Sequence, residues 1–471
     1  MRRNLIILVS IFSINALSAQ VSKFDQFFND KTMRVDYNHS GTLHEEHFAI
    51  QEILSDGIWS GSESTLIDNS GLGIYFFEVL DKESKQLIYS RGFSSIFAEW
   101  QTTAEAHDLW GDFNESLRFP WPKKSVEIIL KKRDIRNKFN IVWRLTIIPD
   151  SRIVNKADIK HYEKIDIIQE KGSVHEKIDL VILGDGYTQN EMEKFSNDAK
   201  RLTEALFTVE PFKSRRNDFN IRAIETPSAI SGISKPHDGI YKRSVLSAKY
   251  SSFDSERYIL AFDNRTIRNI ASAVPYDFMI ILVNEKTYGG GGIYNLYTTV
   301  SVDNLFADYI MIHELGHHMA ALADEYYTSS VAYESPGLRY EPWETNITAN
   351  HDRNTLKWKD LIDSSTPLPT IWNKAIFDNY EYRVQKNRDS LRAVHAPENI
   401  MEDLFTKQLR KESELFSLEK YNGTIGAFEG AGYAAKGMFR PELDCIMFTR
   451  HLKYCKVCSR SLEKVMDEYT H

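Results

Sequence analysis

The chain has 471 residues, of which 42% are hydrophobic and 26% are charged, and this balance is typical of a globular protein with two or three domains. Its formal net charge of −8 shows none of the basic bias of nucleic-acid-binding proteins, so we expect no nucleic-acid partner. Only 3 cysteines are present, all after Arg440. A disulfide scaffold is therefore excluded, and a large hydrophobic core must stabilise the protein.

The N-terminus has the three parts of an export signal. Two arginines follow the first methionine, a mainly apolar run covers residues 5–14, and small residues at 16–19 form a cleavage site before Gln20. A membrane-spanning helix needs about 20 apolar residues, so this run is too short to anchor the protein. We predict a signal peptide over residues 1–19, no membrane span, and export to the periplasm, the cell surface or the extracellular medium.

Residues 20–155 predict an all-β, sandwich-like domain. Short runs of alternating apolar residues are separated by turns rich in Gly, Asp, Asn and Pro, at the spacing that β-sandwiches show. Trp100, Trp110 and Trp121 are either packing residues or a ligand platform, and packing is the commoner use of such side chains. The alternating runs cover residues 73–80, 86–91, 126–130 and 139–148.

A polar, charged linker is predicted over residues 156–177, and a catalytic region over 178–471. In that region the pattern changes to apolar strands that alternate with an amphipathic helix, which predicts an α/β fold. The expected strands cover residues 178–183, 219–224 and 276–283, and the expected helix covers residues 190–209.

Four consecutive glycines occupy residues 289–292. A phosphate-binding loop is excluded because no Lys-Ser/Thr pair follows, and a β-type run comes next instead of a helix. We expect a bulge or a very close backbone approach beside the rim of an active site. The strand that follows, over residues 297–302, is a candidate for pairing with an extended peptide.

His313, Glu314 and His317 form a His-Glu-x-x-His motif inside an apolar helical run. Two histidines four residues apart lie on one face of a helix, so both imidazoles reach the same ion. Zn²⁺ accepts imidazole nitrogen, and catalytic zinc sites combine three protein ligands with one position for water. Glu314 directly follows the first histidine, where its carboxylate can accept a proton from that water. The sequence therefore predicts a zinc hydrolase with one catalytic Zn²⁺, the ligands His313 and His317, and Glu314 as general base.

The third ligand must come from Asp324 or Glu325, which follow the predicted helix. On a continuous helix, residue 324 would lie about 10 Å beyond His317, too far to share one ion. We therefore expect the helix to end near residues 320–323 and the chain to turn back. The carboxylate that is not a ligand is expected to orient a histidine. His318 points about 100° away from His317 and is expected to pack or to face solvent.

Cys455 and Cys458 have the spacing of half a structural zinc site, but no second pair of cysteines completes it. In an exported protein a local disulfide between these two residues is the favoured interpretation. A disulfide from Cys445 to either of them is the alternative.

The chain resembles the M64 family of metallopeptidases, which is commonly labelled the IgA peptidase family. The resemblance covers nearly the whole chain after the predicted signal peptide: residues 24–150 are similar to the β-rich domain that precedes the peptidase, and residues 176–471 to the peptidase itself. The matching segments are 34–37, 91–100, 115–120, 183–187, 288–295, 313–326, 346–350, 358–359, 437–447 and 454–458.

This resemblance implies a metzincin-like fold, in which an α/β lobe precedes the zinc helix and a lower lobe carries a methionine turn. Met447 lies in the segment that matches this turn, which places it beneath the ion as a hydrophobic floor. Residues 399–401 superficially resemble the same turn, but Met401 is the less favoured candidate. The resemblance also favours Asp324 over Glu325 as the third metal ligand. The chain departs from the common metzincin pattern because Ala323 stands where a third histidine is usual.

The implied activity is that of a secreted zinc endopeptidase that hydrolyses peptide bonds in extracellular proteins or glycoproteins. Its oxyanion donor is Tyr326, Tyr433 or another tyrosine, and the long stretch between Tyr327 and Gly437 is expected to shape substrate subsites. The alternative is a catalytically inactive protein- or carbohydrate-binding module on a peptidase scaffold. The intact motif argues against that alternative, and the sequence carries no indication of the oligomeric state.

Overall fold

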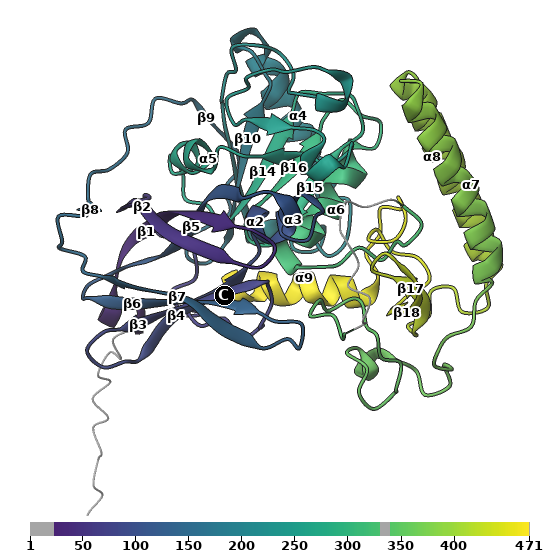
Figure 1. Cartoon of the computed structure of the whole chain (residues 1–471), viewed down its shortest axis with the longest axis horizontal. Coiled ribbons are helices and arrows are strands. Elements are labelled where there is room, and N and C mark those ends of the chain that lie inside the picture. The colour runs from purple at the N-terminus through teal and green to yellow at the C-terminus, as the bar shows by residue number, and fades with distance from the viewer. Residues whose placement is uncertain (1–22, 330–339, 471) are drawn as a thin grey trace, which may run out of the picture.

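The computed structural model describes residues 23–329 and 340–470 and shows two regions that pack against each other (Figure 1). The N-terminal part of the chain forms a β-rich region and the rest forms a mixed α/β region, as the sequence predicted. The predicted signal peptide lies outside the described residues. None of the helices within 23–329 and 340–470 is long and apolar enough to cross a membrane.

Two four-stranded sheets make up the N-terminal region. One has the strand order β5-β1-β2-β8 and the other β4-β3-β6-β7. Neighbouring strands are antiparallel, except that β8 runs parallel to β2. The elements are α1 (Lys23–Phe27), β1 (Phe28–Gly41), β2 (Glu46–Ser55), β3 (Tyr75–Asp81), β4 (Leu87–Phe93), α2 (Ile96–Trp100), α3 (Glu105–Asp108), β5 (Gly111–Pro122), β6 (Val126–Arg133), β7 (Phe139–Ile147) and β8 (Val154–Asn155).

Alternation along β1 builds the core of this region. Met33, Val35 and Tyr37 are 0% exposed and belong to one hydrophobic cluster with side chains from both sheets. Successive residues of a strand point to opposite faces, so the intervening positions cannot enter the same core. They are polar instead, and they lie at the boundary with the C-terminal region.

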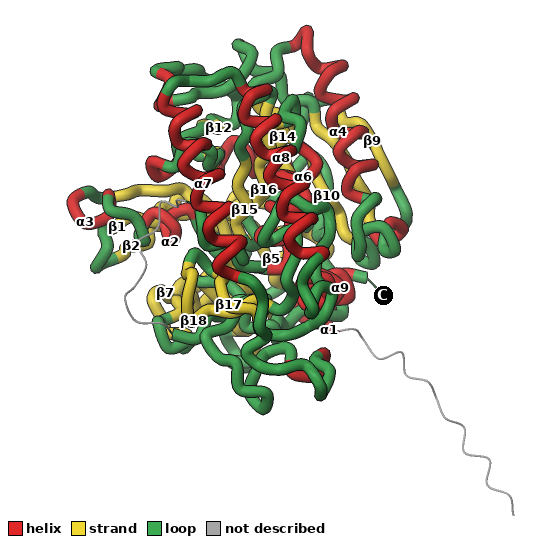
Figure 2. Tube along the Cα trace, turned by 90° about the vertical axis from the view of Figure 1, so that its right-hand side faces the viewer, coloured by secondary structure: helices red, strands yellow, loops and turns green. Residues whose placement is uncertain are grey.

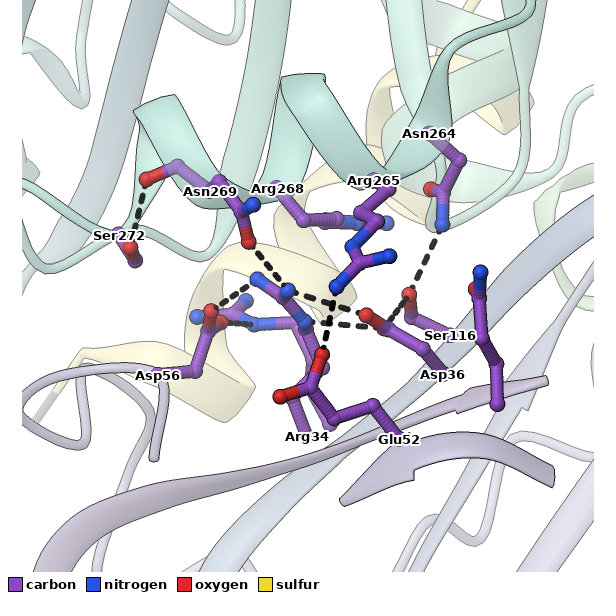
Figure 3. A network of polar contacts seen from close by, with 12 residues as sticks. Arg34, Asp36, Glu52, Asp56, Ser116, Asn264, Arg265, Arg268, Asn269 and Ser272 are labelled. Carbon is purple, nitrogen blue, oxygen red and sulfur yellow. Dashed lines mark hydrogen bonds and ion pairs between the residues drawn. The ribbon is translucent and has the colours of Figure 1, made fainter. Parts of the chain in front are cut away.

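The polar face of β1 is buried against helix α5 (Asn264–Ala271) of the C-terminal region, as Figure 3 shows. Arg34 donates to Asp56 at 2.6 Å and lies 2.9 Å from the carboxylate of Asp36. Its other terminal nitrogen donates to Asn269 of α5 at 2.5 Å. A buried guanidinium is costly unless it is paired, so this network fixes the two regions to each other in one orientation.

The tryptophans of this region are used mainly for packing. Trp100 and Trp121 are 4% and 8% exposed and belong to hydrophobic clusters. Trp110 is 61% exposed and stacks on the imidazole of His47. Two of the three tryptophans thus occupy core positions, which is the commoner use that the sequence suggested.

A six-stranded sheet in the order β15-β16-β14-β10-β11-β9 forms the centre of the C-terminal region. The four inner strands are parallel, whereas the edge strands β15 and β9 are antiparallel to their neighbours. β9 falls inside the stretch that was predicted to be a linker, so the sheet begins before residue 178. The strands are β9 (Ile165–Gln169), β10 (Ile178–Asp185), β11 (Phe219–Ile224), β14 (Phe278–Val283), β15 (Gly290–Ile293) and β16 (Tyr297–Ser301).

Helix α6 (Ala307–Ala320) lies against β15 and β16 and also contacts α4 (Met192–Leu206) and α9 (Lys456–Tyr469). α9 runs through the middle of the molecule, and its C-terminal end reaches the N-terminal region, where Glu468 lies 3.3 Å from Arg91 (Figure 1). α7 and α8 form a hairpin on the outside, seen from the front in Figure 2. The remaining elements are α4 (Met192–Leu206), β12 (Ala248–Lys249), β13 (Leu260–Ala261), α7 (Lys374–Ala393), α8 (Glu398–Ser417), β17 (Phe428–Ala431), β18 (Ala434–Arg440), α9 (Lys456–Tyr469) and the short 3₁₀ helices η1 (Gln189–Glu191), η2 (Arg216–Asp218), η3 (Pro236–Asp238), η4 (Ser252–Asp254) and η5 (Lys359–Leu361).

Candidate metal centre

His313 and His317 lie on one face of α6 with their Nε2 atoms 3.2 Å apart. Each Nδ1 atom has a backbone carbonyl as partner: Ile446 O at 2.9 Å for His313 and Leu322 O at 2.5 Å for His317. A carbonyl only accepts, so Nδ1 must carry the proton in each ring. This tautomer leaves both Nε2 lone pairs directed at the same point, which is how histidines are prepared for a metal ion.

The chain reverses directly after α6. The helix ends at Ala320, and Ala321 adopts a left-handed conformation with φ of 51° and ψ of 35°. The turn returns Asp324 to the histidines, with its Oδ1 3.0 Å from His313 Nε2 and 3.3 Å from His317 Nε2. The break that the distance argument required is therefore present, at the predicted position.

These three atoms fit a tetrahedral cation. Nitrogen and oxygen ligands about 2.0–2.1 Å from a tetrahedral Zn²⁺ lie about 3.3 Å from one another, and the observed separations of 3.0–3.3 Å are close to that value. The Oδ1 atom of Asp324 is buried, and no hydrogen bond with a described residue satisfies it. A buried carboxylate oxygen without a donor needs positive charge beside it.

The pKa shifts of the three groups indicate the same need. Burial by itself would raise the pKa of Asp324, but His317 and His313 hold it well below its usual range. Burial would lower the pKa of His317, but Asp324 raises that pKa to about 9. Positive charge at the imidazoles thus helps to keep the Asp324 carboxylate ionised, and a divalent cation bound by neutral imidazoles would serve the same purpose.

Glu325, the competing candidate for third ligand, points away from the histidines. Its Oε1 accepts from Asn346 Nδ2 at 3.0 Å and lies 3.4 Å from Cys458 Sγ. The expectation that the second carboxylate orients a histidine is wrong, because backbone carbonyls hold both Nδ1 atoms. Two successive carboxylates of one turn therefore enter two different buried groups.

Met447 is fully buried directly below α6. A Cβ atom placed on Gly316, which lies between the two histidines, would come within 2.9 Å of the Met447 sulfur. The glycine therefore allows the methionine to approach the helix backbone. Met401, the similar candidate, is on α8 and packs in the hydrophobic cluster around that helix.

The glycine strand β15 packs directly on α6. A Cβ on Gly292 would lie 2.3 Å from the carbonyl oxygen of Glu314, so only glycine permits this approach. The expected close backbone contact beside the site is present. β16, however, is paired on both edges, by β15 and β14, so it has no free edge for a peptide. The outermost strand on this side is β15, and its Gly290 is itself bonded to the backbone of residues 257–259.

Glu314 lines a cleft of about 610 Å³, together with His313, His317 and Asp324. Burial raises the pKa of Glu314, and the two imidazoles oppose that shift. A carboxylate with a raised pKa is better suited to accept and return a proton than an ordinary surface glutamate.

Two tyrosines border the metal-binding group. The hydroxyl of Tyr433 donates to Asp324 Oδ2, the carboxylate oxygen turned away from the histidines. The hydroxyl of Tyr326 accepts from Arg257 Nη2 at 3.0 Å. Tyr433 is therefore placed to orient Asp324, and the Tyr326–Arg257 pair brings a cation to the wall of the cleft.

His318 is a packing residue, one of the two roles expected for it. It is 1% exposed, lies edge-on to Phe278, and has its Nδ1 3.3 Å from Thr298 Oγ1. Burial lowers its pKa to about 3. It is neutral at ordinary pH and lies away from the metal-binding group.

The N-terminal region also lines the cleft, which sequence reasoning missed. Ser94, Ala98, Glu99 and Thr102 form part of its wall, and Tyr258 of the C-terminal region donates to Glu99. These residues carry no motif, and only the docking of the two regions brings them to the cleft. No sequence signal marks Arg257 either, because it lies in a loop.

Comparison with protein families gives two matches that together span nearly all of the described chain. Residues 166–466 match the model described as IgA Peptidase M64. Residues 23–144 match the model described as Peptidase M64 N-terminus. No curated protein matches the chain.

Proposed function

Because this chain belongs to the IgA peptidase M64 family, a family of peptidases, we propose that it is an exported, zinc-dependent endopeptidase with a metzincin-like catalytic domain. His313, His317 and Asp324 hold one Zn²⁺, Glu314 is the general base, and Met447 is the floor of the site. The convergence of two histidine Nε2 atoms and one buried carboxylate oxygen within 3.0–3.3 Å of each other supports this proposal most strongly.

Zn²⁺ bound there supplies a Lewis acid that polarises a carbonyl and lowers the pKa of water toward 7. Glu314 accepts the proton of the attacking water and delivers it to the amine that leaves. Tyr433, through its hydrogen bond to Oδ2, keeps Asp324 turned toward the histidines. Burial of Glu314 raises its pKa, so the protonated form that donates to the leaving amine is more accessible than for an exposed carboxyl.

An extended peptide segment of an extracellular protein or glycoprotein is the proposed substrate. The cleft of about 610 Å³ is large enough for several side chains, and edge strand β15 lies along it. Ser94, Ala98, Glu99 and Thr102 of the N-terminal region border the same cleft. We propose that this region contributes to substrate selection as well as to stability.

The residue assignments that go with this function follow the sequence. We propose a signal peptide over 1–19, an N-terminal β-sandwich-like domain over 20–155, and a zinc peptidase domain that includes the sheet beginning at β9 (Ile165–Gln169). N-terminal sequencing of the exported protein tests the first assignment. A mature chain that begins at Gln20 is expected, and an intact Met1 on the exported protein contradicts it.

Replacing Glu314 with glutamine tests the proposed chemistry. The Glu314→Gln variant keeps the shape of the side chain but removes the base, so zinc content and thermal unfolding stay near wild type. Peptide cleavage falls by about 10² or more, the scale of lost acid–base catalysis. Glu193→Gln, an exposed position on α4, is the matched control and keeps full activity.

Two results would decide against parts of this proposal. Full cleavage by Glu314→Gln removes the role of general base from this residue. Zinc binding by the wild type without cleavage of any member of a broad peptide and glycoprotein panel supports an inactive binding module instead.

A further inference from the structure

The 3 cysteines and Glu325 form a second buried group of metal-binding side chains, separate from the histidines. One sulfur or oxygen from each residue lies within 4.8 Å of all the others. All four residues are 0% exposed, and they do not line the cleft that contains Glu314. This group needs an explanation other than catalysis.

Three segments bring these side chains together, and one of them lies more than a hundred residues before the other two in the sequence. Cys455 is the N-cap of α9 and Cys458 lies in the first turn of that helix. Cys445 follows β18 and precedes Met447 by two residues. Glu325 directly follows Asp324, and its backbone N–H donates to the carbonyl of Met447 at 2.8 Å. The group thus joins α9, the methionine turn and the segment of the proposed third ligand.

The sulfur atoms are not joined by a disulfide. All 3 cysteines are free, and the Sγ atoms of Cys445 and Cys458 are 3.7 Å apart, whereas a disulfide bond is about 2.05 Å long. The disulfide favoured by the sequence, between Cys455 and Cys458, is therefore absent. The alternative pairings of Cys445 are absent as well.

The separations match the edges of a tetrahedral zinc site. Two thiolates about 2.3 Å from a tetrahedral Zn²⁺ lie about 3.75 Å apart, and a thiolate and a carboxylate oxygen lie about 3.5 Å apart. The observed values are 3.7 Å between Cys445 and Cys458 and 3.4 Å from Cys458 Sγ to Glu325 Oε1.

Two of the three sulfur atoms accept backbone hydrogen bonds, as thiolate ligands do. The backbone N–H of Cys455 donates to Cys445 Sγ at 3.2 Å, and that of Cys458 donates to Cys455 Sγ at 3.4 Å. Donors directed at sulfur favour the deprotonated form. Glu325 Oε2 is buried and makes no hydrogen bond with a described residue. Asn346 at Oε1 therefore offsets only part of the cost of burying this carboxylate, and a bound cation would offset the rest.

We propose that Cys445, Cys455, Cys458 and Glu325 bind a second Zn²⁺ in a closed, structural site. Four protein ligands leave no position for water, which distinguishes structural from catalytic zinc. Binding releases the protons of the thiols, because thiolate is the ligand. The ion fixes Glu325 to α9 and to the methionine turn. Because Asp324 directly precedes Glu325, the same ion also helps to position Asp324 beside the histidines.

The metal content of the purified full chain tests this proposal independently of peptidase activity. Wild type is expected to hold two Zn²⁺ per chain. The double variant His313→Ala/His317→Ala retains one Zn²⁺, and its zinc X-ray absorption shows sulfur at about 2.3 Å. Cys458→Ser retains the ion at the histidines and loses the other, while Ser459→Ala, a neighbour on α9, keeps both.

The state of the thiols gives a second measurement that needs no variant. Wild-type protein unfolded with a chelator and without reductant should titrate with three free thiols. One free thiol would show a disulfide and overturn the proposal, and so would a histidine double variant that folds but contains no zinc. If Cys458→Ser does not fold, the wild-type thiol count and zinc–sulfur distance still decide between the two outcomes.

Discussion

Replacement of Gly292 by alanine tests whether the contact between β15 and α6 positions Glu314, the proposed general base. The added Cβ would lie 2.3 Å from the carbonyl oxygen of Glu314 and 3.1 Å from its Cα, where ordinary contact begins near 3.4 Å. Both partners are backbone, so strand and helix must separate by about 1 Å. Overpacking of this kind costs about 1–3 kcal/mol of stability, and a displacement of about 1 Å at a reacting group costs about 10²-fold in rate.

The assay compares urea unfolding and peptide cleavage of Gly292→Ala with those of wild type and of Gly172→Ala. At Gly172 the nearest atom to an added Cβ is Cε of Lys177 at 3.0 Å, the flexible end of a side chain, so this control should behave like wild type. Gly292→Ala should lose stability and cleavage while keeping zinc at the histidines. Unchanged stability together with unchanged cleavage would refute the view that this contact holds Glu314 in place.

Three further predictions follow from contacts elsewhere. Asp324→Ala should lose the zinc held by the histidines, whereas Glu325→Ala should lose the ion at the cysteines. Zinc analysis combined with X-ray absorption distinguishes the two sites. The reverse pattern of loss would contradict both assignments. Tyr433→Phe removes the donor to Asp324 and should weaken zinc affinity at the histidines by about 10–100-fold, measured by competition with a chelator. Burial would lower the pKa of His39, but Glu115 and Glu46 raise it, so its stabilising charge is fully present below its unfolded pKa and is lost as pH rises through the raised value. His39→Gln should therefore lower the free energy of unfolding, measured in urea, more at about pH 6 than at about pH 9. An equal decrease at both pH values would show that the charge of His39 does not stabilise the protein.

The parts of the fold predicted from sequence are those in which one local pattern dominates. β10 and β14 are buried on both faces. β14 is a continuous apolar run and β10 is mainly apolar, so their positions follow from composition. β9 was assigned to a linker because it is short and lies within a charged stretch, and two of its five residues are polar. β1 was not among the predicted strands, although Met33, Val35 and Tyr37 alternate with polar residues as in a strand. Its polar residues Arg34 and Asp36 are buried too, at the junction with α5, and no local pattern predicts that burial.

The candidate site divides in the same way. Their spacing of four residues places His313 and His317 on one helical face. The helical rise per residue would carry Asp324 too far from His317 to share an ion, so the chain must turn back after the helix. The side to which Glu325 points could not be predicted, because it depends on cysteines more than a hundred residues away in the chain. The contribution of Glu99 to the cleft depends on how two separately built regions dock, which no local pattern encodes.

The central claim is that this chain cleaves peptides by means of the ion held at His313, His317 and Asp324. Its most direct test is the cleavage of a proteome-derived peptide library by zinc-loaded protein, by protein stripped with a chelator, and by stripped protein after zinc is restored, with new termini counted by mass spectrometry. We predict new termini with the loaded and restored protein and none with the stripped protein, which should remain folded in its N-terminal region. Cleavage that persists after zinc has been removed from the histidines would contradict the account.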